Sequence, residues 1–451
     1  MKTQTLSYPV GGGLAVSPDA AQELFRKVLW RLLPILFVAY FFSFLDRVNI
    51  GYAKLQMQPL LGITETQYGL AAGIFFLGYA LFEIPSNLLL DKIGARKTLT
   101  RIMVLWGITS AMTMFVTTAS QLYVLRFLLG VFEAGFFPGV ILYLSYWFPS
   151  YLRGRVTSIL LLATLTAPIL GGPVSGLIMQ NMGGINGWAG WQWMFLLEAL
   201  PIILVGVVCF LCLSDKPEGA SWLSAGEQQL HEQIMRKDRE SHGHDDGHGR
   251  DAILSALIDP RVYLLALLAF SAYCGSYAFN FWLPTMIQQM GIKDVSQIAL
   301  YAVIPFSMAA MGMLLVGRSS DLRRERRWHY ALSMLFAAVM LTVASQWQGS
   351  LLTSLLLLGL AGFGFSGGVT VAWSLPATYL KGKAAPAGIA MVSSLATLSG
   401  FAAPWLIGYT RDLTGSSSAG LITIGGVMLL SALVMIFLVP QSAVHVGARE
   451  D

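Results

Sequence analysis

Six ionisable residues stand in stretches of the chain that are otherwise apolar, and all of them lie in its first half. They are Asp46, Arg47, Glu83, Arg126, Glu133 and Glu198. The segment FFSFLDRVNIGY, residues 41–52, is typical because an acid and a base stand side by side in it. A charge at the centre of a membrane helix costs about 2.5 to 3.5 kcal/mol on insertion scales. Such residues are expected to pair or to face water, and they usually mark a transport path.

Four of these residues have the chemistry that coupled movement of a proton and an anion requires. Burial disfavours the ionised form of a carboxyl group and a neighbouring arginine favours it, so a group under both influences can bind and release protons near neutral pH. Arginine stays charged and can hold a carboxylate through two parallel hydrogen bonds. We predict that Asp46 and Glu133 carry protons, and that Arg47 and Arg126 hold a substrate anion or alternate between it and the acids. The alternative is a static buried charge network that only fixes helix packing.

The spacing of these residues is compatible with one common site. Arg126 and Glu133 are seven residues apart, which places them on one face of a helix about 10 Å apart. Gly130 lies between them and leaves room for a neighbouring helix. At about 1.5 Å per residue, Asp46 and Glu133 reach a similar depth, about 20 Å from the inner ends of their helices.

The elements that position these side chains are predicted to be membrane-spanning helices. The 451-residue chain is 55% hydrophobic and only 12% charged, whereas soluble chains are about one-quarter charged. Twelve apolar segments reach the roughly 20 residues that a membrane span needs: 28–53, 67–90, 98–117, 121–147, 155–181, 192–213, 261–289, 296–317, 328–347, 350–379, 386–410 and 419–439. The fold class is therefore an all-α membrane protein with two six-helix bundles.

The domain organisation follows from the long polar insert after the sixth span. We expect a cytoplasmic tail over residues 1–27, a first bundle over 28–213, a cytoplasmic linker over 214–260, a second bundle over 261–439 and a cytoplasmic tail over 440–451. The linker should contain a short amphipathic helix that begins with a capping box of Ser224 and Glu227. The His-rich stretch over 242–248 is expected to be a solvated linker without a metal.

The positive residues predict the orientation of the chain. With both termini cytoplasmic, nearly all of the 29 lysines and arginines lie on the inner side. The exceptions are Lys54, Lys293 and Arg411 outside and Arg47 and Arg126 within spans. This asymmetry obeys the positive-inside rule, so the net charge of +5 reflects topology and contact with anionic lipid, not nucleic-acid binding.

An internal repeat relates the two halves. NLLLDKIGARK (87–97) and GRSSDLRRERR (317–327) occupy corresponding turns, and Asp91 and Asp321 begin the basic part of each. Parallel repeats of this kind bind substrate between the halves near the midplane. We predict a gating role on the inner side for Asp91, Arg96, Glu83 and Asp321, with helix capping as the alternative for Glu83.

These motifs resemble those of the major facilitator superfamily. The segments FLDRVNIGYA, RFLLGVFEAGFFPG and WQWMFLLEALP together resemble its anion:cation symporter family, which includes bacterial permeases for 4-hydroxyphenylacetate, phthalate and tartrate. The resemblance implies that the first and fourth helices touch, that the protein works as a monomer without a cofactor, and that it lies in the bacterial inner membrane. The family's usual assignment of the charged positions agrees with the chemistry above.

Uncharged polar and aromatic residues are predicted to complete a substrate cavity. They are Tyr79, Asn280, Trp373 and Ser393, and packing or interfacial roles are the alternative for such aromatics. Family members often carry an asparagine where Ser393 stands. Glu198 is expected to anchor the outer loop. The spans of the second half contain no ionisable residue in their interior, which suits a substrate with an acid at one end and an uncharged body.

The function predicted from these features is import of a small organic carboxylate by proton symport with alternating access. No GxxxxGK[ST] loop for nucleotide binding is present, so ATP-driven transport is not expected. Exchange of anions, efflux or proton-independent transport of the same substrates is the first alternative. A membrane enzyme or a nutrient sensor is the second, and the spans offer neither a nucleophile–base set nor an appended signalling domain.

Overall fold

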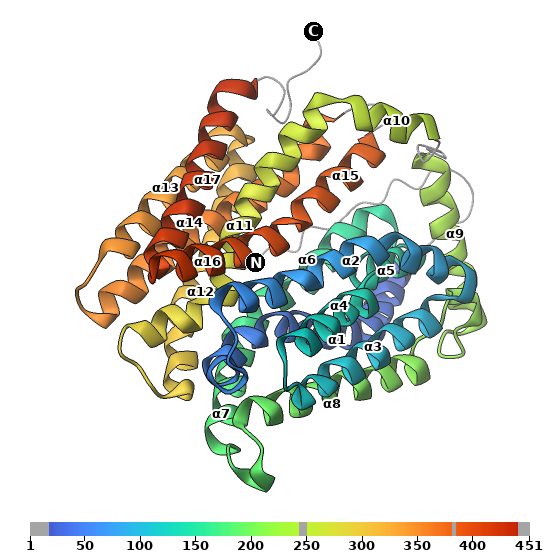
Figure 1. Cartoon of the computed structure of the whole chain (residues 1–451). Coiled ribbons are helices and arrows are strands. Elements are labelled where there is room, and N and C mark those ends of the chain that lie inside the picture. Colours follow the sequence, from blue (N-terminus) through green and yellow to red (C-terminus); the bar gives the residue numbers. More distant parts are fainter. Residues whose placement is uncertain (1–17, 243–249, 381–384, 441–451) are drawn as a thin grey trace.

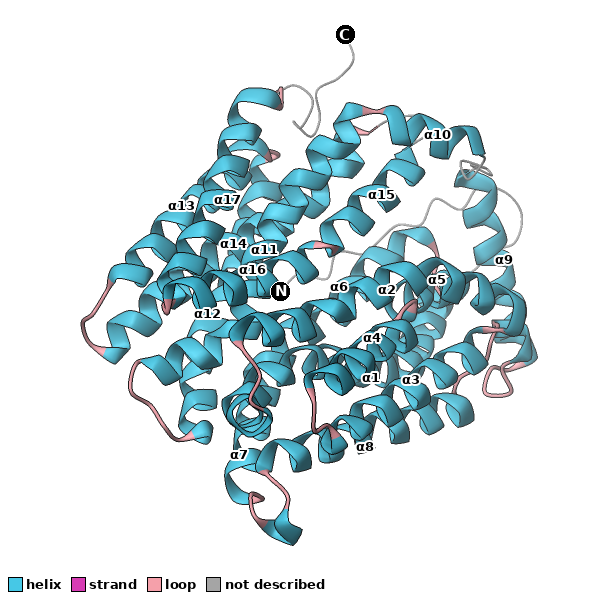
Figure 2. Cartoon of the chain, viewed as in Figure 1, coloured by secondary structure: helices cyan, strands magenta, loops and turns pink. Residues whose placement is uncertain are grey.

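The polypeptide folds into helices and loops throughout the part described by the computed structural model, which covers residues 18–242, 250–380 and 385–440 (Figure 2). Twelve spans in this part are long and apolar enough to cross a membrane. The prediction of an all-α membrane fold with twelve transmembrane helices is confirmed.

The spans form two groups, which lie side by side in Figure 1. The first half comprises α1 (Pro18–Leu61), α2 (Glu65–Ile93), α3 (Ala95–Met112), α4 (Ala119–Glu133), α5 (Phe136–Trp147), α6 (Ser150–Thr166), α7 (Gly172–Asn181) and α8 (Gly190–Cys212). The second half comprises α11 (Pro260–Gln289), α12 (Val295–Arg323), α13 (Arg327–Gln346), α14 (Leu351–Tyr379), α15 (Ala385–Thr397), α16 (Ser399–Thr414) and α17 (Ser417–Leu438). Between them are α9 (Ala225–His242) and α10 (Arg250–Ile258). We call the end of the bundle that carries α9 and α10 the linker end, and the opposite end the far end.

Helix α1 is longer than predicted at both ends. It begins at Pro18 and not at residue 28, because Ala21, Leu24, Phe25 and Val28 continue the helical spacing of buried residues. It also runs to Leu61, beyond the predicted limit of 53. The part of the predicted tail over residues 18–27 is therefore helix.

Three predicted spans are interrupted. The predicted helix over 121–147 breaks between α4 and α5, where Gly135 has a φ of 81°, a left-handed conformation that favours glycine. A π-helical turn over Ala167–Gly171 separates α6 from α7, and Pro168 in it lacks the backbone N–H that a regular helix uses. The predicted helix over 386–410 divides at Leu398 into α15 and α16.

The described part of the linker contains two α-helices, α9 and α10, whereas one was predicted. The predicted capping box at the start of α9 is confirmed, since Ser224 N lies 2.8 Å from Glu227 Oε2 and Glu227 N lies 3.3 Å from Ser224 Oγ. Lys27 of α1 lies 2.8 Å from Glu227, and its hydrogen bond lowers the pKa of that carboxyl group. Buried His231 Nε2 lies 3.0 Å from the carbonyl oxygen of Trp147. These contacts hold α9 against the first half; the His-rich stretch lies almost wholly outside the described residues.

Glycines allow the closest helix contacts. A Cβ on Gly130 would lie 2.0 Å from the carbonyl oxygen of Phe75, so α4 and α2 pass with their backbones in contact. The predicted room beside Gly130 is thus filled by α2. Between the halves, a Cβ on Gly69 would lie 2.4 Å from the carbonyl oxygen of Pro404, which brings α2 equally close to α16.

Candidate functional site

Arg47 and Glu133 form a buried ion pair between α1 and α4. Arg47 Nε lies 2.7 Å and its terminal nitrogen 2.6 Å from Glu133 Oε1, and Ser43 Oγ donates to the same oxygen at 2.7 Å. The Glu133 side chain is fully buried, whereas that of Arg47 is 14% exposed. Glu133 Oε2 has no hydrogen-bond partner among the described residues. The pair therefore combines one strongly held carboxylate oxygen with one that is free to bind a proton.

Arg126 lies two turns earlier on α4 and is buried without a carboxylate partner. Its Nε lies 3.4 Å from the carbonyl oxygen of Ala71, while Nη1 and Nη2 make no hydrogen bond within the described chain. The guanidinium carbon lies 5.2 Å from the centre of the Phe75 ring, and that of Arg47 lies 5.5 Å from the same ring. The two guanidinium groups thus lie near one aromatic side chain, and the donors on Nη1 and Nη2 of Arg126 remain unused among the described residues.

Asp46 points away from Arg47, into the interior of the first half. Its carboxylate accepts hydrogen bonds from Trp106 Nε1 at 2.7 Å, Ser110 Oγ at 2.5 Å and Asn49 Nδ2 at 3.2 Å. The sequence suggested one shared site for two acids and two bases. The structure instead places Asp46 against α3 and the Arg47–Glu133 pair against α2 and α4.

Glu198 belongs to the same interior cluster as Asp46. Asn49 Nδ2 lies 3.0 Å from Glu198 Oε2, and Ser175 Oγ lies 2.6 Å from Glu198 Oε1. The prediction of an outer-loop anchor was wrong, because the side chain is only 4% exposed and contacts α1 and α7 inside the half.

The predicted cavity residues fall into two groups. Tyr79 lies beside the ion pair, with the Arg47 guanidinium carbon 5.0 Å from its ring centre. Half-exposed Trp373 is farther away and donates a hydrogen bond from Nε1 to Tyr273 Oη. The Tyr273 ring stacks on Tyr277 at 5.7 Å between centres, and Tyr277 contacts Phe76 of the first half at 4.5 Å. An aromatic column therefore runs from Trp373 toward α2.

Among the described residues, neither Asn280 nor Ser393 forms a side-chain hydrogen bond or ion pair with Arg47 or Glu133. Asn280 is buried where α11 passes α1, since a Cβ on Gly51 would lie 3.0 Å from its carbonyl oxygen. Ser393 is half-buried on α15, and its carbonyl oxygen accepts a hydrogen bond from Thr397.

The residues predicted to gate the inner side lie at the linker end, except for Glu83. The backbone N of Arg96 lies 2.8 Å from Asp215 Oδ1, and its guanidinium carbon lies 4.4 Å from the centre of the Phe210 ring. Asp321 pairs with Arg326 at 2.6 Å within its own turn. Asp91 is near the end of α2, but its side chain is outside the described part. Half-buried Glu83 lies one turn from Tyr79, and its carbonyl oxygen accepts a hydrogen bond from Asn87.

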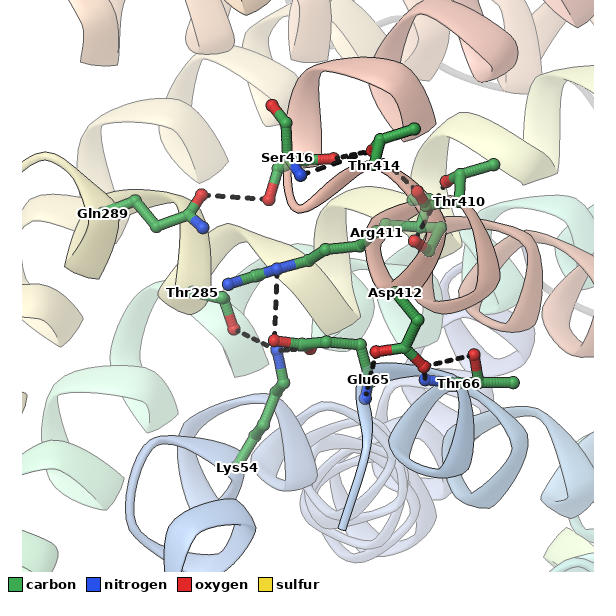
Figure 3. A network of polar contacts seen from close by, with 12 residues as sticks. Lys54, Glu65, Thr66, Thr285, Gln289, Thr410, Arg411, Asp412, Thr414 and Ser416 are labelled. Carbon is green, nitrogen blue, oxygen red and sulfur yellow. Dashed lines mark hydrogen bonds and ion pairs between the residues drawn. The ribbon is translucent and has the colours of Figure 1, made fainter.

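A second charged cluster, which the sequence did not predict, joins the two halves at the far end (Figure 3). Lys54 Nζ lies 2.7 Å from Glu65 Oε2 and 3.1 Å from Thr285 Oγ1, and Arg411 Nε lies 3.1 Å from Glu65 Oε1. Asp412 accepts hydrogen bonds from Thr66 N at 2.8 Å and Glu65 N at 3.2 Å. We call Lys54, Glu65, Thr285, Arg411 and Asp412 the far-end cluster.

One feature of the sequence indicates that a cluster of this kind exists at the far end. Lys54 and Arg411 are two of the three basic residues assigned to the outer side, where positive residues are rare. Lys54 is only 1% exposed and lies 4.1 Å from the centre of the Trp282 ring. An isolated cation that far from the basic side needs a partner, and Glu65 is the acid that begins the next helix.

A family model for the Major Facilitator Superfamily matches residues 36–404 of the chain. The chain belongs to this superfamily. The superfamily predicted from the loop and helix motifs is therefore confirmed.

Relatives over nearly the whole length agree with this membership. The chain is 41% identical to "Putative metabolite transport protein NicT" of Pseudomonas putida, over 95% of this chain and 98% of that protein. It is 43% identical to a "Putative tartrate transporter" of Agrobacterium vitis, over 94% of this chain and 96% of that protein. These names fit the anion:cation symporter family, and the chain is a transporter and not an enzyme.

A solved structure shows the same fold at low sequence identity. A bacterial homologue of the human lysosomal transporter Spinster, in an inward-facing and unoccupied conformation, superimposes with a TM-score of 0.72 and 15% identity, covering 94% of this chain and 96% of that one. In this chain, α1 and α4 are in contact through the side chains of Ser43, Arg47 and Glu133.

Proposed function

We propose that this transporter imports a small organic carboxylate together with protons, and that Arg126 and Arg47 form its anion site. The observation that carries the proposal is the Arg126 guanidinium group, which is 1% exposed and has two nitrogens without a partner in the described chain. A buried charge without hydrogen bonds is costly. Two parallel bonds to a substrate carboxylate would remove that cost and use the planar geometry of arginine.

The Arg47–Glu133 pair supplies the coupling step. While Glu133 is ionised, it holds Arg47 by two nitrogens and competes with any substrate anion for that group. When Glu133 takes up a proton, its attraction for Arg47 falls and Arg47 can turn to the substrate. Proton binding and anion binding therefore favour each other at adjacent side chains, which is the linkage that symport needs.

The surroundings of the anion site support a proposal for the substrate class. Tyr79 and the aromatic column of Tyr273, Tyr277 and Trp373 offer flat apolar surfaces with hydroxyl and indole donors. The relatives' names include tartrate transport. We propose a substrate with one carboxylate for Arg126 and an uncharged or hydroxylated body for the aromatic side chains.

Alternating access would use the far-end cluster as one of its closures. With both termini cytoplasmic in a bacterial inner membrane, the far end faces outward, and the contacts of Lys54, Glu65 and Arg411 close that side. One chain contains both halves and the proposed site, so a monomer would suffice.

The test is uptake into proteoliposomes with an imposed pH gradient, using tartrate, gluconate and 4-hydroxyphenylacetate as probes. We expect uptake of one class to rise with a proton gradient directed inward, and the vesicle interior to acidify as substrate enters. Glu133→Gln should abolish the effect of the gradient while exchange of internal for external substrate continues. Glu240→Gln, a matched change at a side chain that is 67% exposed, is the control.

The same assay separates the alternatives. Uptake that needs internal anion and ignores the gradient would support exchange. Normal uptake by both Arg126→Ala and Arg47→Ala would refute the anion site.

A further inference from the structure

Asp46 and Glu198 form a pair of buried acids joined by one amide. We call Asp46, Asn49, Trp106, Ser110, Ser175 and Glu198 the inner acid cluster. Asn49 Nδ2 lies 3.2 Å from Asp46 Oδ1 and 3.0 Å from Glu198 Oε2, so it bridges the two carboxyl groups. The acids are 1% and 4% exposed. Neither forms an ion pair with a lysine or arginine of the described residues.

Two ionised carboxylates this close and this buried would repel each other strongly. In such pairs one group keeps a proton, and the proton belongs to the pair as a unit. The hydrogen bonds indicate which acid is ionised here. Asp46 accepts from Trp106, Ser110 and Asn49, an arrangement of donors that suits a negative charge. Glu198 has fewer donors, so the proton is better placed on it.

The hydroxyl group of Ser175 gives an independent reason. Its oxygen lies 3.0 Å from the carbonyl oxygen of Gly171 and 2.6 Å from Glu198 Oε1. A serine hydroxyl has one proton to donate, and a carbonyl oxygen can only accept. If that proton goes to Gly171, the short contact to Glu198 needs a proton on the carboxyl group. Protonated Glu198 therefore satisfies both contacts at once.

We propose that Glu198 holds a proton in this conformation and that Asn49 couples its protonation to that of Asp46. Asp46 and Glu198 then carry one proton and one negative charge between them: when the proton moves from Glu198 to Asp46, one O–H bond breaks as the other forms, and the pair never carries two adjacent charges. Other charged or titratable groups lie within electrostatic reach of the two acids. Tyr52 interacts with Glu198, and Arg126 and Glu133 interact with Asp46. The proton on Glu198 follows from the cluster alone; its use in transport rests on the proposed symport.

The first test measures the proton directly by infrared spectroscopy of the purified protein in lipid at neutral pH. Glu198→Gln should remove one carbonyl-stretch band of a protonated carboxylic acid. Glutamine preserves the cluster, since its amide can donate to Ser175 and accept from Asn49, so its thermal unfolding should match that of the wild type. Glu83→Gln, a matched change outside the cluster, should leave the band in place. A spectrum that loses no band in Glu198→Gln refutes the proposal.

The second test measures the coupling between the two acids. Asp46→Asn removes the neighbouring negative charge, so Glu198 should lose its proton at a lower pH than in the wild type, and the band should disappear there first. An identical titration of the band in both proteins would overturn the coupling through Asn49.

The third test connects the cluster to transport and keeps the two proposals separable. At a gradient of one pH unit, each coupled proton supports about a tenfold accumulation ratio. For the probe among the three that the wild type takes up, Glu198→Gln should lower the accumulation ratio by about tenfold, and an unchanged ratio would remove Glu198 from the coupling. If wild-type uptake ignores the gradient, the proposed symport fails, while the infrared result still decides whether Glu198 holds a proton.

Discussion

Glu65→Gln should loosen the closure between the two halves at the far end. The Glu65 carboxylate is the common partner of Lys54 at 2.7 Å and Arg411 at 3.1 Å. Without its charge, two cations face each other, and Lys54 is only 1% exposed. The conformation that contains these contacts should therefore lose free energy relative to one in which the far end is open.

The size of the effect follows from burial. Removing one partner of a fully buried pair costs about 3 to 5 kcal/mol. The side chains of Glu65 and Arg411 are 16% and 15% exposed, so solvent screens part of the interaction. A loss of about 2 to 3 kcal/mol corresponds to a change of roughly 30- to 150-fold in the ratio of closed to open states.

Distances between spin labels across the far end measure this ratio. Leu60 at the end of α1 and Leu413 at the end of α16 are 65% and 67% exposed and belong to different halves. Cysteines for labelling would replace both, in a chain whose Cys209, Cys212 and Cys274 are changed to alanine. We expect one short distance in this background and an added longer distance with Glu65→Gln.

The control for this experiment is Glu240→Gln, which removes the same charge from an exposed pair on α9. It should leave the distances unchanged. If Glu65→Gln also gives the unchanged distribution, the far-end cluster does not stabilise the closed state, and the reasoning from burial and shared partners is refuted.

Three further predictions concern single side chains. Arg126→Lys should weaken binding of the transported probe at least about tenfold, because a charged hydrogen bond contributes about 1.5 to 3 kcal/mol. Equal affinity, measured by calorimetry beside Arg236→Lys, would contradict this. Gly130→Ala should lower the unfolding temperature, because the new Cβ would lie 2.0 Å from the Phe75 carbonyl oxygen and overpacking costs about 1 to 3 kcal/mol. Gly426 has open space around it, so Gly426→Ala should not lower the unfolding temperature. Equal effects of the two substitutions would argue against a close contact between α4 and α2. Burial lowers the pKa of His231, so docking of α9 should be strongest above the ordinary histidine pKa of about 6.5 and weaken as pH falls below it. The hydrogen-exchange rate of α9 should therefore rise below that pH. In His231→Gln the exchange rate of α9 should not show this rise.

The sequence predicted the spans well because long apolar segments have few alternatives in a membrane. The breaks within spans were missed at Gly135, Pro168 and Leu398, since each segment is apolar on both sides of its break. Tertiary contacts decide such positions: a Cβ on Gly135 would lie 2.6 Å from Ser86, so the left-handed turn serves a close approach to α2.

The arrangement of the charged residues was predictable only in part. The pairing of an arginine on α1 with an acid on α4 was expected, and Arg47 and Glu133 form such a pair. The direction in which the Asp46 side chain points was not predicted, although helix geometry indicates it. Successive residues of a helix point about 100° apart, so Asp46 and Arg47 cannot serve the same face.

The periodicity of α1 also explains how one helix can serve three groups of contacts. Ser43 and Arg47, four residues apart, both bind Glu133. Asp46 and Asn49, three residues apart, both belong to the inner acid cluster.

Lys54 stands seven residues beyond Arg47, close to the same face, and reaches Glu65 in the far-end cluster. A rotation or tilt of α1 that follows release of Arg47 from Glu133 would therefore move Lys54 as well. Under the proposed symport, the side chain that would respond to the proton and the side chain that would close the far end lie on one continuous helix. Protonation and access could then influence each other directly through α1, without a longer chain of contacts.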